Sequence, residues 1–417
     1  MTSRLPIEIL LIHFSGPDRP GLTAGLTSIL AHYNVNILDI GQAVVHENLA
    51  LGMLIQVPPE KNFGPLKVAL LSGAFELGLQ AHFTTLTREA VNHWLNGRRA
   101  DHFIITVLGR AISAQHIAEV SAILSAHAMN VDRIDRLSAQ LSPTDLTTNA
   151  CIEFAVSGDA TREIPMRAEF LATAQKLSVD IAFQRESIFR RNRRLFAFDM
   201  DSTLIQGEVI DELAKMAGVG EQVAKITEAA MRGELGFDES FTRRVALLRG
   251  LPAEQVHTLL DSIPLADGAE RLIRTLKLLG YKTAILSGGF NFFAQHLQKN
   301  LGIDYVYSNE LEIADGKVTG CVIPPIVNGA RKAALLGEIA EREGISLEQV
   351  VAVGDGANDI PMLSLAGMGI AYRAKPLVRQ SADQSISNLG LDGLLYIIGV
   401  RDQDLLPHEE AIAASGL

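Results

Sequence analysis

Cysteine is nearly absent from this sequence, which has only Cys151 and Cys321 among its 417 residues. Two cysteines so far apart cannot form a disulfide framework or supply a four-ligand zinc site. A reducing compartment is the simpler interpretation of this scarcity. We therefore expect a soluble protein of the cytoplasm.

Long apolar runs are also missing, because no uncharged segment approaches the length needed to span a bilayer. The apolar N-terminal stretch 7–14 is interrupted by Glu8, ends at a polar turn and is followed by no cleavage site. It is interpreted as a strand and not as a signal peptide. We expect no association with a membrane.

Positive charge is in deficit, with 37 Lys and Arg against 48 Asp and Glu and a net charge of −11. The sequence thus lacks the basic footprint that nucleic-acid backbones require, and we expect no nucleic-acid partner. Apolar residues, in contrast, make up 47% of the chain, which is ample for buried cores. At roughly 150 residues per domain, the length predicts two to four domains.

The first half contains a faint internal repeat, between residues 7–40 and 101–135. Each copy has an apolar strand, then Gly16 or Gly109, then a helix, then an asparagine and a β-branched residue that lead into another strand. The matched order favours duplication over chance similarity of two amphipathic segments. We predict two small β-α-β-type modules.

The second half alternates apolar strands with helical patterns. Strands are predicted at 195–199, 282–287 and 350–355, each ending in a polar residue or glycine. Continuous apolar strands separated by helices predict a doubly wound, Rossmann-like parallel sheet with both faces covered. The segment 185–195 contains five arginines, for which a solvated linker is the more common meaning and an anion-binding patch the alternative.

These patterns predict an α/β protein in which two α+β modules precede the doubly wound domain. The predicted boundaries are 1–97 for the first module, 98–184 for the second, 185–194 for a linker, 195–400 for the α/β domain, about 208–266 for a helical insert within it, and 401–417 for a loose tail.

Short polar motifs follow the three predicted strands: DMDST at 199–203, SGG at 287–289 and GDGAND at 354–359. Ligands of open α/β sheets bind at the carboxyl ends of the strands, so we expect the three motifs to meet at one site. Asp199, Asp201 and Asp355 would then repel one another unless one is protonated or a cation is bound. Oxygen ligands of this kind favour Mg²⁺.

The same strand ends carry groups that suit an anion. Ser287, Gly288 and Gly289 offer a hydroxyl and exposed N–H groups, and Lys332 supplies a positive charge further along the chain. Mg²⁺, a lysine and N–H donors are the parts that phosphoryl transfer needs, because its catalysis is mainly positioning and charge stabilisation.

The ordered set D-x-D-S-T, S-G-G, lysine and G-D-G-x-N-D resembles the haloacid dehalogenase-type phosphatase superfamily over most of residues 195–375. A lone D-x-D motif is weak evidence for this superfamily. Four motifs in the expected order are strong evidence, because three carboxylates would rarely stand at the ends of strands in this pattern by coincidence. The resemblance implies that Asp199 is the nucleophile that forms an aspartyl-phosphate. Asp201 would act as general acid and base, and its backbone carbonyl would bind Mg²⁺ beside the side chains of Asp199 and Asp355.

The resemblance also assigns the phosphate site. Ser287, the Gly288 N–H and Lys332 would hold the phosphate oxygens, and Lys332 would offset the charge of the nucleophile. Gly289 would support this turn. Asn358 and Asp359 would order the metal loop, with Asn358 able to reach the phosphate.

The insert would form a cap over the site, and its sequence, GEVIDELA at 207–214 and MRGELGFDESFTRRVALLRG at 231–250, resembles the phosphoserine phosphatase family. By this resemblance Glu208 binds the substrate ammonium and Arg244 the carboxylate, with Met231 and Phe237 as an apolar wall. The milder alternatives stay open. Glu208 could simply favour a helix N-terminus, the two apolar residues could be core, and Arg243 competes with Arg244.

The resemblance implies a Mg²⁺-dependent enzyme that hydrolyses O-phospho-L-serine to L-serine and phosphate, the last step of serine biosynthesis. One alternative is a phosphatase or phosphotransferase for another small phosphorylated alcohol. Another is an amino-acid sensor with a degenerate phosphatase half, against which the intact motifs argue.

The turn G-P-D-R-P-G at 16–21, between an apolar strand and a helix that leads to V-N-I, resembles ACT domains, which often bind amino acids at dimer interfaces. The resemblance implies that Gly16, Asp18 and Asn36 line a ligand site, for which serine is the hypothesised effector, and that the protein is a homodimer. The second module has Gly109 but lacks D-R-P-G. Its role, and equally that of the first, could be dimerisation alone.

Overall fold

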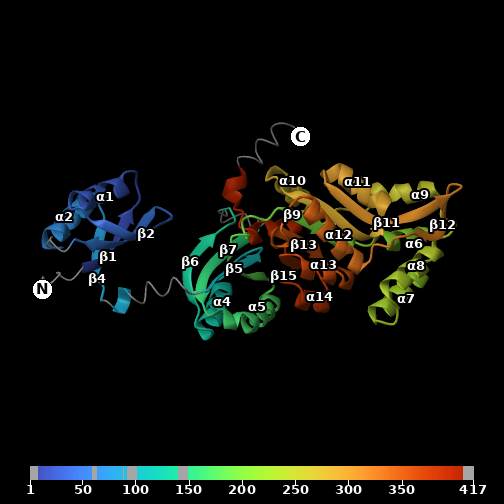
Figure 1. The fold of residues 1–417 in the computed structure, drawn as a ribbon, viewed down its shortest axis with the longest axis horizontal. Coiled ribbons are helices and arrows are strands. Elements are labelled where there is room, and N and C mark those ends of the chain that lie inside the picture. The colour runs from blue at the N-terminus through green and yellow to red at the C-terminus, as the bar shows by residue number, and fades with distance from the viewer. Residues whose placement is uncertain (1–7, 59–62, 88, 92–100, 140–148, 407–417) are drawn as a thin grey trace. The chain divides into compact units, whose positions relative to one another are not determined.

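The computed structural model divides the chain into two compact units, Met1–Ala100 and Asp101–Leu417 (Figure 1). The residues it describes are 8–58, 63–87, 89–91, 101–139 and 149–406. Within this part of the chain, no helix is both long and apolar enough to cross a membrane. Cys151 is buried, Cys321 is exposed, and both are free thiols.

The first unit is a four-stranded antiparallel sheet covered by two helices. Its elements are β1 (Glu8–Pro17), α1 (Leu22–His32), β2 (Asn36–Val45), β3 (Asn48–Val57), α2 (Phe63–Glu76) and β4 (Gln80–Thr85), with the strands in the order β2-β3-β1-β4. Leu10, Ile12 and Phe14 alternate along β1 and are buried against the apolar face of α1. The period-two pattern of the strand thus meets the helical period of its partner.

The second module repeats this arrangement at the start of the second unit. Its elements are β5 (Asp101–Gly109), α4 (Ala114–Ala126), β6 (Asn130–Arg136), β7 (Ala150–Gly158), α5 (Glu163–Leu177) and β8 (Asp180–Arg185), with the strands in the order β6-β7-β5-β8. The predicted pair of α+β modules is confirmed. Each module extends the predicted β-α-β pattern to β-α-β-β-α-β.

A seven-stranded sheet follows, in the order β12-β11-β10-β9-β13-β14-β15. Its strands are β9 (Leu195–Phe198), β10 (Lys282–Phe290), β11 (Tyr305–Ala314), β12 (Lys317–Ile323), β13 (Val350–Gly354), β14 (Met368–Tyr372) and β15 (Gln384–Ile386). All neighbouring pairs are parallel except β11–β12. The predicted parallel sheet is confirmed, with β9 near its centre.

Alternate residues of β9 enter two different cores. Phe196 and Phe198 pack with the helices of one face, and Leu195 and Ala197 with those of the other. The first face is covered by α10 (Ala269–Leu278) and α11 (Asn291–Leu301), and the second by α12 (Gly329–Arg342) and α13 (Ile360–Leu365). Because β9 is covered by helices on both faces, all of its side chains are buried, and this explains why its residues are apolar in succession.

The predicted helical insert lies between β9 and β10. It consists mainly of α6 (Val209–Met216), α7 (Gly220–Met231), α8 (Phe237–Leu247) and α9 (Ala253–Thr258) (Figure 1). Two further short helices, α14 (Pro376–Ser381) and α15 (Leu394–Ile397), flank β15.

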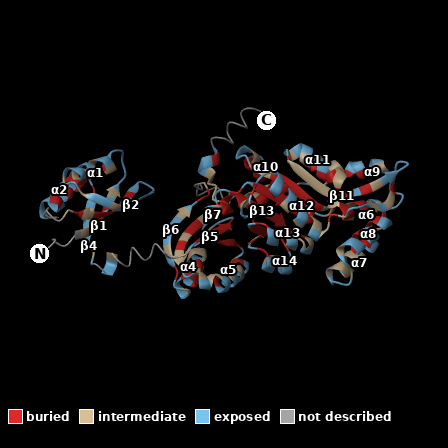
Figure 2. Ribbon diagram, viewed as in Figure 1, coloured by how far each residue is buried: buried red, intermediate tan, exposed pale blue. Residues whose placement is uncertain are grey.

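The second module packs directly on the large domain. Leu108, Cys151 and Ala182 belong to the same apolar core as β9 and α10, and Figure 2 shows buried residues on β5 and β7 as well as on the large sheet. The Gln384 side chain pairs with the backbone of Phe183 through two hydrogen bonds of 2.8 Å, in the manner of one more rung of β8. One face of the second module therefore joins the core of the large domain, while the other face packs in a core of its own.

The arginine-rich segment 185–195 supports this junction. Arg190 is fully buried and donates a hydrogen bond to the buried carboxylate of Glu153 on β7. Arg193 is also buried and donates to the backbone oxygen of Glu348. The interpretation of this run as a solvated linker is wrong for these two residues, because each meets an acceptor on a neighbouring element.

Candidate active site

The three motifs predicted to meet lie along one cavity of about 630 Å³ between the strand ends and the cap. Asp199 follows β9, Gly288 and Gly289 lie near the end of β10, and Asp355 follows β13. Parallel strands bring their carboxyl ends to one edge, and this explains the convergence of residues far apart in sequence. The other wall consists of cap residues, among them Glu208 and Arg244.

Asp199 and Asp201 are held in place by backbone N–H groups. Asp199 Oδ1 accepts a hydrogen bond from the Met200 N–H (2.7 Å), and the Asp199 N–H donates to Val353 O (2.9 Å). Asp201 Oδ1 accepts from the N–H of Val209, the first residue of α6 (2.8 Å). The second aspartate of the motif therefore also fixes the start of the cap.

Lys332 lies beneath the carboxylates and is fully buried. Its Nζ is 2.9 Å from Asp199 Oδ1 and 2.7 Å from Asp359 Oδ1. Burial opposes the charged form, but the two carboxylates outweigh it and raise the pKa of Lys332. The lysine thus stays charged and offsets the charge of Asp199.

The acidic residues are crowded. Asp199, Asp355 and Asp359 each place a carboxylate oxygen within 4.8 Å of the others. Burial and the charge of Asp199 raise the pKa of Asp355 to about 8 and that of Asp359 to about 7. Asp359 already accepts hydrogen bonds from Lys332 and from the Gly356 N–H (2.9 Å). Asp199 and Asp355 are therefore the side chains that best suit a shared cation.

The surroundings of Asp201 also favour its protonated form. Burial, followed by the charges of Glu208 and Asp199, raises the pKa of Asp201 well above its usual range. Such a buried carboxyl remains protonated at a pH where an ordinary aspartate is ionised. It can therefore donate a proton to a group in the cavity.

The glycine turn approaches Asp201 closely. A side-chain Cβ at Gly289 would lie 2.2 Å from Asp201 Oδ2, so no larger residue fits there without displacing that carboxyl. Ser287 is fully buried, and its Oγ accepts a hydrogen bond from the Gly289 N–H (2.9 Å). Gly288 and Gly289 line the cavity, and Ser287 lies just behind them.

Two opposite charges project from the cap. Glu208 precedes α6 without making a side-chain capping bond, and it lines the cavity. Arg244 lies on α8, and its buried Nε has no hydrogen-bond partner within the described part of the chain. Arg243, the rival assignment, is exposed and pairs with Glu239 (2.5 Å).

The apolar wall is formed by Phe237, the first residue of α8, which stacks on Phe241 with ring centroids 5.9 Å apart. A Cβ at Gly288 would lie 2.6 Å from the Phe237 ring, so the ring covers the glycine turn. Asn358 also lines the cavity. Met231 ends α7, and its side chain lies outside what the structure describes.

Lys375 lines the cavity too, although the sequence patterns did not single it out. It directly precedes α14, three residues after β14 ends, and its charge acts on Glu208. The signal for it in the sequence is the short apolar run 368–372, a further strand whose carboxyl end lies at the same edge of the sheet as Asp199 and Asp355.

The predicted regulatory residues belong to the first unit. Asp18 and Asn36 are exposed there, and the Asp18 N–H donates to Glu47 O (2.8 Å). Gly16 has a φ of 155°, and a Cβ on it would lie 2.9 Å from the backbone oxygen of Gly78. The turn therefore requires glycine for its backbone geometry.

Family models match three parts of the chain. Residues 193–367 match the haloacid dehalogenase-like hydrolases, and residues 8–84 and 100–184 each match an ACT domain. The predicted family and fold class are confirmed by these matches.

Full-length relatives are similar along nearly the whole chain. The phosphoserine phosphatase of Streptomyces coelicolor is 42% identical over 96% of this chain and 94% of its own length. That of Mycobacterium tuberculosis is 40% identical over 95% of this chain and 94% of its own length. The crystal structure of a haloacid dehalogenase-family hydrolase from Salmonella enterica serovar Typhi superposes with a TM-score of 0.60, at 33% identity, over 71% of this chain and 99% of that one.

Proposed function

The chain belongs to the phosphoserine phosphatases, within the haloacid dehalogenase-like hydrolases, and on that premise we propose that it hydrolyses O-phospho-L-serine to L-serine and phosphate. The observation that supports this substrate most directly is the pair of opposite charges on the cap. Glu208 faces the cavity with a carboxylate, and Arg244 has a buried guanidinium nitrogen without a partner in the described residues. An amino acid offers an ammonium and a carboxylate to complement both.

In the first step a carboxylate oxygen of Asp199 attacks phosphorus, and the bond between phosphorus and the serine oxygen breaks. The departing oxygen takes the proton of Asp201, whose raised pKa supports this role. The product is an aspartyl-phosphate at Asp199 and free serine. A water molecule then attacks phosphorus, gives its proton to Asp201 and releases phosphate from Asp199.

We assign the phosphate oxygens to Ser287, the Gly288 N–H, Lys332 and Asn358. The position of Gly288 and Asn358 on the cavity wall supports direct contact. Lys332 contributes mainly by offsetting the charge of Asp199 and holding it in place, because its Nζ lies 2.9 Å from Asp199 Oδ1. Phe237 would exclude water above the glycine turn.

The carboxylates suit Mg²⁺, which would be held by Asp199, Asp355 and the backbone oxygen of Asp201. When bound, Mg²⁺ neutralises charge on the phosphate and so favours attack by a carboxylate. The raised pKa values of Asp355 and Asp359 are the electrostatic sign that these groups need either protons or a cation.

The activity is tested by phosphate release from O-phosphoserine in Mg²⁺, with a panel of sugar phosphates for comparison. Asp199→Asn should reduce kcat by several orders of magnitude, because the amide cannot act as the nucleophile. Arg244→Met should raise KM for O-phosphoserine, and Arg243→Met is its matched control. Comparable turnover of sugar phosphates would contradict the serine assignment.

The metal has a separate test in its pH dependence. The pKa of Asp355, raised to about 8, means that the cation-free site binds protons at neutral pH. Mg²⁺ must displace them, so its affinity should rise as the pH increases from 6 to 8, by up to about tenfold per unit for one displaced proton. Calorimetric titration at several pH values measures this, and an affinity independent of pH would contradict it.

We further propose that serine binds the first module at Gly16, Asp18 and Asn36 and inhibits the enzyme, and that the protein is a homodimer in the cytoplasm. Exposed apolar side chains on the edge strand β2, Ile40 and Val45, support pairing with a second copy. Light scattering measures the mass in solution. Serine inhibition that persists after deletion of residues 1–100 would refute binding to the first module.

A further inference from the structure

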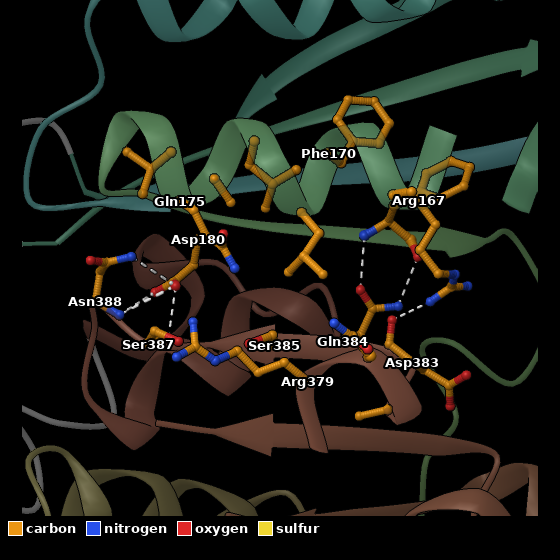
Figure 3. Close-up of a pocket in the computed structure, with 18 of the residues that line it drawn as sticks. Arg167, Phe170, Gln175, Asp180, Arg379, Asp383, Gln384, Ser385, Ser387 and Asn388 are labelled. Atoms are coloured by element: carbon orange, nitrogen blue, oxygen red, sulfur yellow. Dashed lines mark hydrogen bonds between the residues drawn. The ribbon is translucent and has the colours of Figure 1, made fainter. Parts of the chain in front are cut away.

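A second cavity of about 460 Å³ lies in the second unit, between α5 of the second module and residues 379–388 of the large domain (Figure 3). It shares no lining residue with the active-site cavity. Its volume is within the range of small-molecule sites, roughly 300–1,000 Å³.

The module side of this cavity is largely apolar. Leu171 and Ala174 of α5 line it together with Val179 and Ile181, which are buried. Ile164 lines it as well and remains 83% exposed, so apolar surface extends to solvent. This wall suits an apolar body on the ligand.

Most of the charged groups around the cavity are already engaged. The Asp180 carboxylate accepts hydrogen bonds from the N–H groups of Ser387 (2.7 Å) and Asn388 (2.9 Å), as the dashed lines of Figure 3 show. Arg167 donates to the backbone oxygen of Asp383 and to the carboxylate of Glu163. These bonds hold the walls of the cavity in place.

Arg379 is the exception. It lies on α14, on the wall opposite α5, and its Nε donates to Ala374 O (2.6 Å). Its two Nη atoms have no partner among the described residues. Ser385 and Ser387 offer hydroxyls on the same wall. A single guanidinium with two free nitrogens matches one carboxylate as a two-pronged donor.

The same helix reaches the active site. Lys375 directly precedes α14 and lines the active-site cavity, whereas Arg379, four residues later, lines the second cavity. Any shift of α14 caused by a ligand on Arg379 would therefore change the position of a positive charge in the active site.

We propose that this cavity binds a small carboxylate with an apolar body, with Arg379 as the partner of the carboxylate, and that its occupancy alters catalysis through α14. The binding part holds whether or not O-phosphoserine is the substrate, since the two cavities are separate.

Binding is tested by isothermal titration calorimetry of the full chain with 3-phenylpropionate. The uncharged 3-phenylpropanamide, which has the same apolar body, should bind at least about tenfold more weakly, because the charge-assisted bond is lost. The substitution Arg379→Met should weaken the binding of 3-phenylpropionate by a similar factor. Ala168→Trp, which fills the cavity from the exposed side of α5, should abolish its binding.

The matched control is Arg274→Met, an exposed arginine of α10 that lines neither cavity, and it should leave the affinity unchanged. Equal affinity of the acid and the amide, or of wild type and Arg379→Met, would overturn the proposal. The proposal would also be overturned if the affinity for 3-phenylpropionate were lost in Arg244→Met and kept in Arg379→Met, because the probe would then occupy the active site.

The kinetic part is tested with the same probe. Saturating 3-phenylpropionate should change kcat/KM of the wild-type phosphatase reaction at least about twofold, and the change should disappear in Arg379→Met. Binding that leaves both kinetic constants unchanged would overturn the role of α14. An enzyme inactive on O-phosphoserine would refute the proposed function, while the calorimetric result would stand.

Discussion

The two ACT modules have the same order of elements and the same strand order, yet they are used differently. In the second module Asp180 pairs in register with Leu108, and in the first module Gln80 pairs in the corresponding way with Ser15. Asp180 is buried and accepts four N–H groups from residues 387–389, whereas Gln80 is exposed. The first module forms a unit of its own, and the second shares a core with the phosphatase domain.

We infer from this difference that a few polar positions attach the second module to the large domain. The cores of both modules are built from alternating apolar residues, which specify the module fold but not its neighbour. The neighbour is specified by groups such as Asp180, Gln384 and the Arg190–Glu153 pair, which form hydrogen bonds across the junction.

The largest effect is expected at Arg190. Arg190→Met leaves the buried Glu153 carboxylate with only the exposed Arg191, 4.0 Å away, and this should lower the free energy of unfolding by about 3–5 kcal/mol. Urea denaturation followed by circular dichroism measures the loss. The double variant Arg190→Met/Glu153→Leu should recover most of it, because both buried charges are then gone. A loss below about 1 kcal/mol in the single variant would show that the pair does not hold the junction.

Asp180 and Gln80 form a matched pair of sites. Asp180→Ala removes the acceptor of the Ser387, Asn388 and Leu389 N–H groups and should cost about 1–3 kcal/mol in the unfolding of the second unit. Gln80→Ala, at the corresponding exposed position, should change stability by less than about 0.5 kcal/mol. Equal effects of the two substitutions in urea denaturation would remove the contrast between the modules.

Gly16 and Gly109 occupy matching positions in the two modules, and here the larger effect of substitution is expected in the first module. Gly16→Ala meets the backbone oxygen of Gly78 at 2.9 Å and requires an unfavourable φ, so it should cost about 1–2 kcal/mol in the first unit. Gly109→Ala meets the side chain of Val179 at 3.1 Å, which can shift, and the backbone oxygen of Ala111 at an ordinary contact distance of 3.4 Å, so it should cost less than about 1 kcal/mol. Thermal melts monitored by circular dichroism compare them, and a costlier Gly109→Ala would contradict the inference.

The smallest effect is expected from removing residues 1–100. Since this deletion removes one compact unit and no residue of the active-site cavity, kcat should stay within about twofold of the full chain. Phosphate release measured with and without serine would also report whether inhibition is lost. A large fall in kcat would show that the first module contributes to the reaction.

Much of the active site could be predicted from the sequence. Asp199, Gly288 and Asp355 line one cavity because parallel strands end at one edge of a sheet, and the strands were visible as apolar runs. How deeply each of these residues is buried could not be predicted from the sequence. Ser287 and Lys332 are fully buried behind the cavity wall, and burial depends on how β10 and α12 pack rather than on the motif.

Packing also determines which of two adjacent residues lines the cavity. Arg243 and Arg244 are adjacent on α8, so they point to different faces of the helix, and only contact with the large domain shows which face lines the cavity. Lys375 carries no motif, and Arg190 looked like one more solvated arginine in a charged run. Their positions depend on partners that are distant in sequence, such as Glu208 and Glu153.

Periodicity and short motifs are local, so the two modules, the parallel sheet, the family and the carboxylates at the strand ends could be predicted without knowledge of packing. The attachment of the second module, the position of Arg244 rather than Arg243 on the cavity wall, the position of Lys375 beside it and the cavity at Arg379 are visible only in the folded protein. Each of these depends on which surfaces meet after folding, and the free energy of such contacts is set by partners that no local pattern identifies.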